Sequence, residues 1–293
     1  MRAPWISSFL FAFFLNLSSI ATQPRFIRSH YNSIAHLSTT WTNNDSSIPY
    51  TGYAKGSRFR VIFQNIAGVS HFSCGFFCNG NCSSYLFVII INTTPTRYQA
   101  VVWSANRDNL VREGATLNLT AAGELVLHDV DGNIVWTSNR AGKYVDGMNL
   151  TDNGNLVLFD DHNKTVWQSF DHPTDCLVPG QKLFQGQKLI PSVSSTDWTS
   201  QKDLFYLQVT YKGLFAYVGS NSPQFYDSYF VDVTGIGKDA DAGRTYVGLF
   251  NEGGSLYFSL YIERASGSHQ IGSIPGFSPL YIKLMPDGHL KAF

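Results

Sequence analysis

The sequence contains few charged residues. Asp, Glu, Lys and Arg make up 14% of the 293 residues, and 21 basic residues are balanced by 21 acidic ones. A globular protein usually has about 25% charged residues. Because no basic surplus is available to neutralise phosphates, the composition argues against nucleic-acid binding.

Catalytic motifs are missing as well. The sequence has no Gly-x-Ser-x-Gly elbow, no His-Glu-x-x-His pair, no Walker loop and none of the kinase motifs. One alternative stays open, because distant Asp and Glu residues can meet in a fold and form the paired carboxylates of a glycosidase. We expect a protein without enzymatic activity, cofactor or metal.

Long apolar runs are confined to the N-terminus. Arg2 precedes the run Phe9–Leu15, and the small residues Ser19 and Ala21 suit a signal peptidase, which predicts a signal peptide at residues 1–21. An uncleaved anchor is the alternative. The longest later apolar stretch, Tyr85–Ile91, is too short to span a bilayer and predicts a buried strand. We therefore expect a secreted, extracellular chain without a membrane span, in the apoplast or cell wall, or at the cell surface if it is part of a longer receptor.

Only four cysteines are present, and four allow three fully paired connectivities. Cys78 and Cys82 flank the turn-forming triplet Asn79–Asn81, so we expect them to pair across a hairpin neck. Cys74 and Cys176 then form the second pair or stay free. A metal site would need further His or Cys ligands at suitable spacing.

Asn-x-Ser/Thr triplets mark acceptor sites for N-glycosylation on an exported chain. Each triplet alone is a weak signal. Six follow the predicted signal peptide, so we expect glycans on at least some of them: Asn44, Asn81, Asn92, Asn118, Asn149 and Asn163.

The middle of the chain repeats itself at an offset of 31 residues. Eleven of the 22 positions from 117 to 138 are identical to those from 148 to 169, without a gap. Each unit ends in Val-Trp, at Trp136 and Trp167, and a third such ending stands upstream at Trp103. With 15% aromatic residues and 25 glycines, the pattern favours short strands and tight turns.

Each unit is predicted to form a four-stranded antiparallel sheet. Leu117 and Leu119 alternate with polar residues, Gly123 permits a tight turn, and Leu125 and Leu127 alternate again. A single unit cannot cover its own apolar face. We therefore predict three sheets around a pseudo-threefold axis, with the three tryptophans buried together on it.

These residues resemble the bulb-type, mannose-binding lectin domain, in the version found at the front of plant G-type lectin S-receptor-like serine/threonine kinases and their secreted relatives. The resemblance rests on three motifs in order: Val102–Asp108, Gly154–Leu158 and Val166–Asp175. It implies an all-β fold, a β-prism of three four-stranded sheets, over residues 49–172. Residues 22–48 would form an N-terminal segment.

Residues 173–293 are predicted to form a second, degenerate copy of this domain, so that two prisms stand in tandem. Asp287-Gly288 follows the same scheme as Asn153-Gly154. Because the Val-Trp endings are absent, we expect other aromatic residues to fill the axis of this copy: Phe215, Tyr217, Tyr257 and Phe258. We place the linker at residues 173–180.

In sugar-binding members of the family, each unit carries Gln-x-Asp-x-Asn-x-Val-x-Tyr, whose amide and carboxylate groups bind vicinal sugar hydroxyls. By resemblance, the pattern falls on Thr151, Asn153, Asn155, Val157 and Phe159, of which only the Asn and the Val are kept. The upstream unit keeps only Val126, and the second half keeps only Asp287. The sequence therefore predicts degraded sugar pockets.

Two functions from different classes follow. The resemblance implies a secreted or ectodomain lectin that binds mannose-type or cell-wall glycans without catalysis. The alternative is a receptor-type module that binds an extracellular protein or peptide and keeps only the lectin scaffold. Either function leaves a homodimer open, and kinase activity would need a downstream domain that these 293 residues lack.

Overall fold

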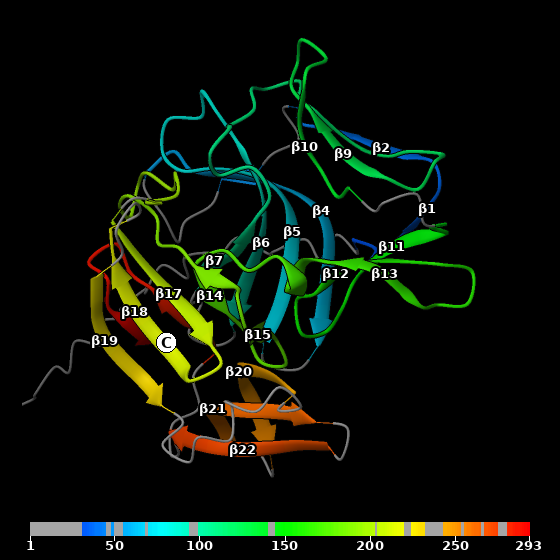
Figure 1. The fold of residues 1–293 in the computed structure, drawn as a ribbon. Helices are drawn as coiled ribbons and strands as arrows, with labels where there is room; N and C mark the ends of the chain where they lie inside the picture. The colour runs from blue at the N-terminus through cyan, green and yellow to red at the C-terminus, as the bar shows by residue number, and fades with distance from the viewer. Residues whose placement is uncertain are drawn as a thin grey trace, which may run out of the picture. The chain divides into compact units, whose positions relative to one another are not determined.

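The chain forms strands throughout the part that the structure, a computed structural model, describes (Figure 1). The only helical element there is one turn of 3-10 helix, η1 (Ser169–Asp171). The predicted all-β class is confirmed. The predicted signal peptide at residues 1–21 lies outside the described residues, which are 31–44, 48–49, 55–67, 70–93, 99–139, 144–202, 204–219, 224–231, 243–252, 255–264, 267–274 and 280–293.

The first sheet follows chain order and is antiparallel. Its strands are β3 (Ile48–Pro49), β4 (Arg58–Ala67), β5 (Ser70–Cys78), β6 (Leu86–Thr93) and β7 (Gln99–Ser104). Every residue of β6 is buried, as the apolar run predicts, because alternate side chains enter different clusters. Phe87 and Ile89 pack on one face, and Val88 and Ile90 on the other. This sheet has five strands instead of the four expected.

The first sheet and two further sheets hold the three Val-Trp endings, and we call these three the lectin sheets after the resemblance; the two further ones have four strands each. One is ordered β10-β9-β8-β2 and the other β1-β11-β12-β13. Their strands are β1 (Ile34–His36), β2 (Thr39–Thr42), β8 (Thr116–Leu119), β9 (Leu125–His128), β10 (Ile134–Thr137), β11 (Gly147–Leu150), β12 (Leu156–Phe159) and β13 (Thr165–Gln168).

The N-terminal strands differ from the expected boundary at residue 49. β1 pairs with β11 and β2 pairs with β8, so the segment 34–42 is part of the lectin sheets. Without these strands, β8 and β11 would each expose a row of unpaired backbone groups, which is the reason the earlier segment is needed. Composition alone does not show this pairing, because β1 and β2 have only three and four residues.

The repeated turns close in the same way. Gly123 and Gly154 have φ of 77° and 80°, and their N–H groups donate to the carbonyl oxygens of Thr120 and Thr151. A left-handed backbone is readily adopted by glycine. The serine of each Val-Trp-x-Ser ending accepts a hydrogen bond from a backbone N–H on the preceding strand: Ser138 from Leu125, and Ser169 from Leu156. The repeat therefore conserves hydrogen-bond geometry as well as apolar spacing.

Three tryptophans meet where the three lectin sheets converge. The ring centroids are 6.0 Å apart for Trp103 and Trp136, 6.2 Å for Trp103 and Trp167, and 5.8 Å for Trp136 and Trp167. All three contacts are edge-to-face, a geometry that contributes about 0.5–1.5 kcal/mol per pair beyond burial. Trp103 and Trp167 are buried and Trp136 is half-buried. The predicted indole cluster is confirmed.

The remaining strands form three more sheets, ordered β16-β17-β18-β19, β15-β20-β21-β22 and β14-β23-β24. They share one aliphatic core that includes Leu183, Leu207, Val247 and Leu260. We propose that they form the second, degenerate prism. The strands are β14 (Cys176–Leu177), β15 (Lys182–Phe184), β16 (Lys188–Leu189), β17 (Phe205–Thr210), β18 (Gly213–Val218), β19 (Gln224–Val231), β20 (Arg244–Glu252), β21 (Ser255–Arg264), β22 (Gly267–Ile274), β23 (Ile282–Leu284) and β24 (Leu290–Ala292).

Most of the aromatic residues that we expected along the axis of this half lie elsewhere, so that prediction was wrong for them. Phe258 lies in the core, but Phe215 and Tyr217 lie on the face of β18 opposite the core residues Leu214 and Ala216. Tyr257 is half-buried, since its neighbour Phe258 takes the inward position. Aliphatic side chains make up most of the core of this half.

The expected linker also differs from the structure, since residues 173–180 include strand β14, which pairs with β23. Next to it, the buried guanidinium of Arg107 donates to the carbonyl oxygens of Ile190 (2.6 Å) and Pro191 (3.0 Å). Asp175 lies 3.9 Å from Arg107 and 3.2 Å from Lys283 on β23. These contacts fix the segment that follows the lectin sheets, because a buried cation is costly without partners.

Replacing Trp167 with alanine is expected to lower the free energy of unfolding by about 3–5 kcal/mol, because a buried aromatic ring and its two indole contacts are lost. Urea unfolding measures the change. Tyr144→Ala is the matched control: Tyr144 is 60% exposed, so a change within about 0.5 kcal/mol is expected. Equal effects of the two substitutions would contradict the central position of Trp167.

Candidate functional site

The sugar pattern implied by the resemblance falls on β12 and the turn before it. Asn155, only 8% exposed, uses both ends of its amide within the protein. Its Nδ2 donates to Gln168 Oε1 (2.8 Å), and its Oδ1 accepts from Ser169 Oγ (3.2 Å) and the Phe170 N–H (3.3 Å). The retained asparagine therefore holds β12 to β13 and η1.

The other positions of the pattern are also engaged. Thr151 Oγ1 donates to Asn153 Oδ1 (2.6 Å) and accepts from the Asn155 N–H (3.0 Å). Val157 is buried, and the Phe159 ring lies against Gly147 and makes an edge contact with His36. A ring without a hydroxyl thus stands where the family pattern has tyrosine.

The equivalent positions elsewhere show the same internal bonding. In the upstream unit, Thr137 donates to Glu124, and Asn118 accepts from Thr40 and contacts His128. In the second half, exposed Asp287 accepts a hydrogen bond from the His289 N–H in a turn, and this bond is the main cause that lowers its pKa. The polar side chains at these positions therefore bond within the protein.

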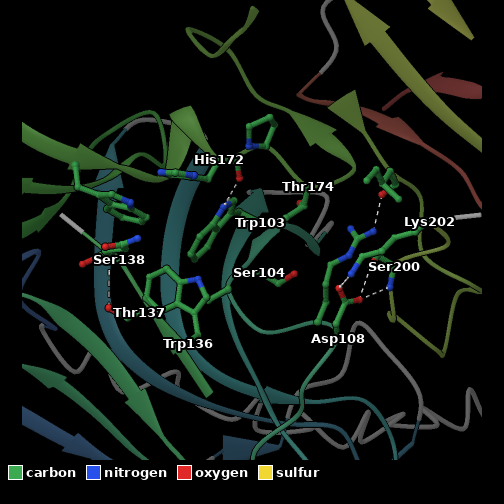
Figure 2. A pocket seen from close by; sticks show the side chains of 16 residues that line it. Trp103, Ser104, Asp108, Trp136, Thr137, Ser138, His172, Thr174, Ser200 and Lys202 are labelled. Carbon is green, nitrogen blue, oxygen red and sulfur yellow. Dashed lines mark hydrogen bonds and ion pairs between the residues drawn. The ribbon is translucent and has the colours of Figure 1, made fainter. Parts of the chain in front are cut away.

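A cavity of about 440 Å³ opens at the indole cluster, between the lectin sheets and residues 190–202 (Figure 2). Small-molecule sites are usually about 300–1,000 Å³. Figure 2 shows Trp103 and Trp136 on one side of the cavity, Asp108, Ser200 and Lys202 on the other, and Ser104 between them. We name this space the axial cavity. None of the five residues that carry the sugar pattern lines it.

The charges at the axial cavity are paired. Asp108 forms an ion pair with Lys202 and accepts hydrogen bonds from the backbone and the hydroxyl of Ser200. Burial would raise the pKa of Asp108, but the hydrogen bonds from Lys202 and Ser200 lower it to about 2. Burial lowers the pKa of His172, against the opposing effect of Asp171, so this ring is neutral at neutral pH. Sequence reasoning missed the cavity, although Asp108 belongs to the first family motif.

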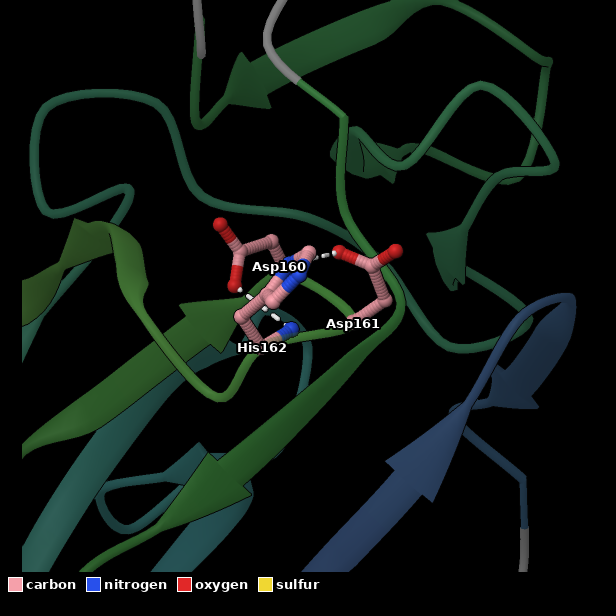
Figure 3. Close-up of side chains that lie close together, drawn as sticks. All are labelled: Asp160, Asp161 and His162. Atoms are coloured by element: carbon pink, nitrogen blue, oxygen red, sulfur yellow. Dashed lines mark hydrogen bonds and ion pairs between the residues drawn. The ribbon is translucent and has the colours of Figure 1, made fainter.

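One cluster has the composition of a cation site. Asp160, Asp161 and His162 bring one ligand atom each within 4.8 Å of one another, in a turn after β12 (Figure 3). Asp160 Oδ1 already accepts the N–H groups of His162 (3.0 Å) and Lys164 (2.8 Å), and His162 Nδ1 lies 2.7 Å from Asp161. The carboxylates therefore shape an exposed turn, and we assign no metal to it.

Two of the four cysteines are bonded to each other. Cys78 and Cys82 form a disulfide, whereas Cys74 and Cys176 are free and buried, and burial raises the pKa of both thiols.

The asparagines of the Asn-x-Ser/Thr triplets (sequons) differ in exposure. Asn44, Asn81 and Asn163 are exposed, Asn118 and Asn149 are half-buried, and Asn92 is buried in β6. Burial of Asn92 makes it a poor acceptor for a glycan.

Residues 100–199 match a family model described as D-mannose binding lectin. EP1-like glycoprotein 2 of Arabidopsis thaliana is 40% identical over 159 residues, which cover 48% of this chain and 34% of that protein. A G-type lectin S-receptor-like serine/threonine-protein kinase of Arabidopsis thaliana is 38% identical over 157 residues, covering 52% of this chain and 17% of the kinase. The resemblance to the bulb-type lectin domain, and to these receptor-like kinases and glycoproteins, is confirmed.

Among solved structures, a monomeric monocot mannose-binding lectin from Gastrodia elata aligns with 18% identity and a TM-score of 0.24, covering 36% of this chain and 94% of the lectin. The match to the glycoprotein spans about a third of that relative's length. In the part of the chain that the structure describes, no helix has the length and apolar character needed to cross a bilayer.

Replacing Asn155 with alanine is expected to destabilise the fold by about 1–3 kcal/mol, because buried Ser169 and half-buried Gln168 and Phe170 lose their hydrogen-bond partner. Denaturant unfolding measures the loss. Asn153→Ala, at an exposed neighbour in the same pattern, is expected to change stability by no more than about 0.5 kcal/mol. An equally small loss of stability in Asn155→Ala would show that Asn155 does not hold these elements together.

The Asp108 ion pair makes a pH prediction. The folded-state pKa of about 2 lies below the ordinary value of 3.8, so the contribution of Asp108 is present above pH 4 and is lost as the pH falls from 4 to 2. Wild-type protein should therefore lose more stability over this interval than Asp108→Asn, as measured by urea unfolding at each pH. Parallel pH profiles for the two proteins would refute the pairing.

Proposed function

We propose that this protein recognises neutral glycans outside the cell without catalysing a reaction. One observation supports the proposal: the three tryptophans that pack together all lie within the residues that match the D-mannose binding lectin family. Mannose-type and cell-wall glycans are the ligand classes that the similarity to this family suggests for the domain. The predicted signal peptide and the exposed sequons support an extracellular location.

A second function is favoured by one specific observation. The amide of Asn155 is fully used within the protein, and Phe159 has no hydroxyl to offer. A chain that lost sugar binding at this pattern and kept the scaffold would serve as an interaction module for an extracellular protein or peptide. Fold alone does not decide between these functions, because a scaffold can host different sites.

A glycan array followed by calorimetry separates the two functions. The protein is enzymatically deglycosylated first, so that its own glycans do not occupy the site. The first function predicts saturable binding to neutral glycans that free hexose competes away. A blank array, with calorimetry also showing no heat of binding, would reject the first function and leave the interaction module.

A further inference from the structure

The axial cavity has unused hydrogen-bonding groups next to an aromatic wall. Trp103 Nε1 donates to the carbonyl oxygen of His172 (2.8 Å). No acceptor among the described residues forms a hydrogen bond with the indole N–H of Trp136 or of Trp167, and both rings line the cavity. The indole N–H of a buried or half-buried tryptophan usually finds a partner. A ligand with oxygen acceptors would supply one.

The cavity also offers hydroxyl groups. The side chains of Ser104 and Thr174 line it in the space between the tryptophans and the Asp108–Lys202 pair (Figure 2). Thr174 makes one long hydrogen bond, to Asp175 Oδ1 at 3.4 Å. A hydroxyl both donates and accepts a hydrogen bond, so these groups suit a ligand whose own hydroxyls do the same.

The electrostatics favour a neutral ligand. The carboxylate of Asp108 forms an ion pair with the ammonium of Lys202. The guanidinium of Arg107 donates hydrogen bonds to two backbone carbonyls and lies near the carboxylate of Asp175. A charged ligand would enter without a counter-charge and would lose its hydration, which is costly. An uncharged ligand avoids that cost.

We propose that the axial cavity binds a single neutral hexopyranose unit of a glycan, with its apolar ring face against Trp136 and its hydroxyls toward the Trp indole N–H groups and Thr174. This inference rests on the proposed function and assigns it to a site distinct from the pattern at residues 151–159. A pyranose presents C–H groups on one face and hydroxyls around its rim, which matches an aromatic wall facing a polar wall. The cavity size suits one such unit better than an extended chain.

The test titrates the deglycosylated full-length protein with methyl α-mannoside, methyl glucoside and methyl galactoside, followed by tryptophan fluorescence and calorimetry. We expect a saturable response to at least one of them, with a dissociation constant on the order of 1 mM for so small a ligand. Thr174→Phe places a ring in the cavity and is expected to weaken binding at least 10-fold. Thr42→Phe, at the exposed edge strand β2, is the matched control and should bind as wild type does.

A second variant keeps the proposal testable if Thr174→Phe does not fold. Lys202→Gln leaves the Asp108 carboxylate unpaired, so preference should shift at least 3-fold from methyl glucoside toward the cationic sugar glucosamine. Lys212→Gln, in the exposed β17–β18 turn, should leave the preference unchanged.

The outcomes separate this inference from the proposed function. The inference is overturned if the array shows glycan binding, Thr174→Phe binds like wild type and Lys202→Gln shows no shift toward glucosamine. In that case the axial cavity is not the site, while glycan recognition stands. If the array is blank and no methyl hexoside changes the fluorescence, both fail. Loss of hexoside binding in Thr174→Phe alone, or the glucosamine shift in Lys202→Gln alone, supports the axial site.

Discussion

The structure depends on the mutual contact of three indoles. The two four-stranded lectin sheets have strands of only three or four residues, so neither can stand alone in water. The Val-Trp endings bring one large aromatic ring from each sheet to the same place, where Trp103, Trp136 and Trp167 pack edge to face. Closure of the prism therefore follows from one type of contact made three times, and the repeated turns and serine hydrogen bonds set the strand register that makes it possible.

The same contact creates the axial cavity. Three rings in an edge-to-face triangle leave one of them, Trp136, only half-buried, and the segment of residues 190–202 that Arg107 anchors stands opposite it. At the position that the resemblance aligns with the sugar pattern, the amide of Asn155 instead connects β12 to β13 and η1. The polar groups of this pattern are bonded within the protein, whereas the indole N–H groups of Trp136 and Trp167 have no partner among the described residues.

Much of the fold could be predicted from the sequence, because repeats and apolar alternation report local structure directly. The 31-residue offset, the buried β6 and the indole cluster all follow from such patterns. The pairing of β1 and β2 could not be predicted, since strands of three and four residues carry little periodicity and their partners lie far along the chain. In the second half, Phe215 and Tyr217 look like core residues by type, but their alternation with Leu214 and Ala216 places them outside. The axial cavity was missed for a similar reason: Asp108, His172 and Lys202 are distant in sequence, and only folding brings them together.

A double-mutant cycle between Trp103 and Trp167 tests the central contact most directly. The free energies of unfolding of Trp103→Leu, Trp167→Leu and the double variant are compared with that of the wild type. Rings 6.2 Å apart in edge-to-face contact should show a coupling energy of about 0.5–1.5 kcal/mol. Additive effects, with a coupling near zero, would mean that the indoles do not meet and would contradict the prism closure described above.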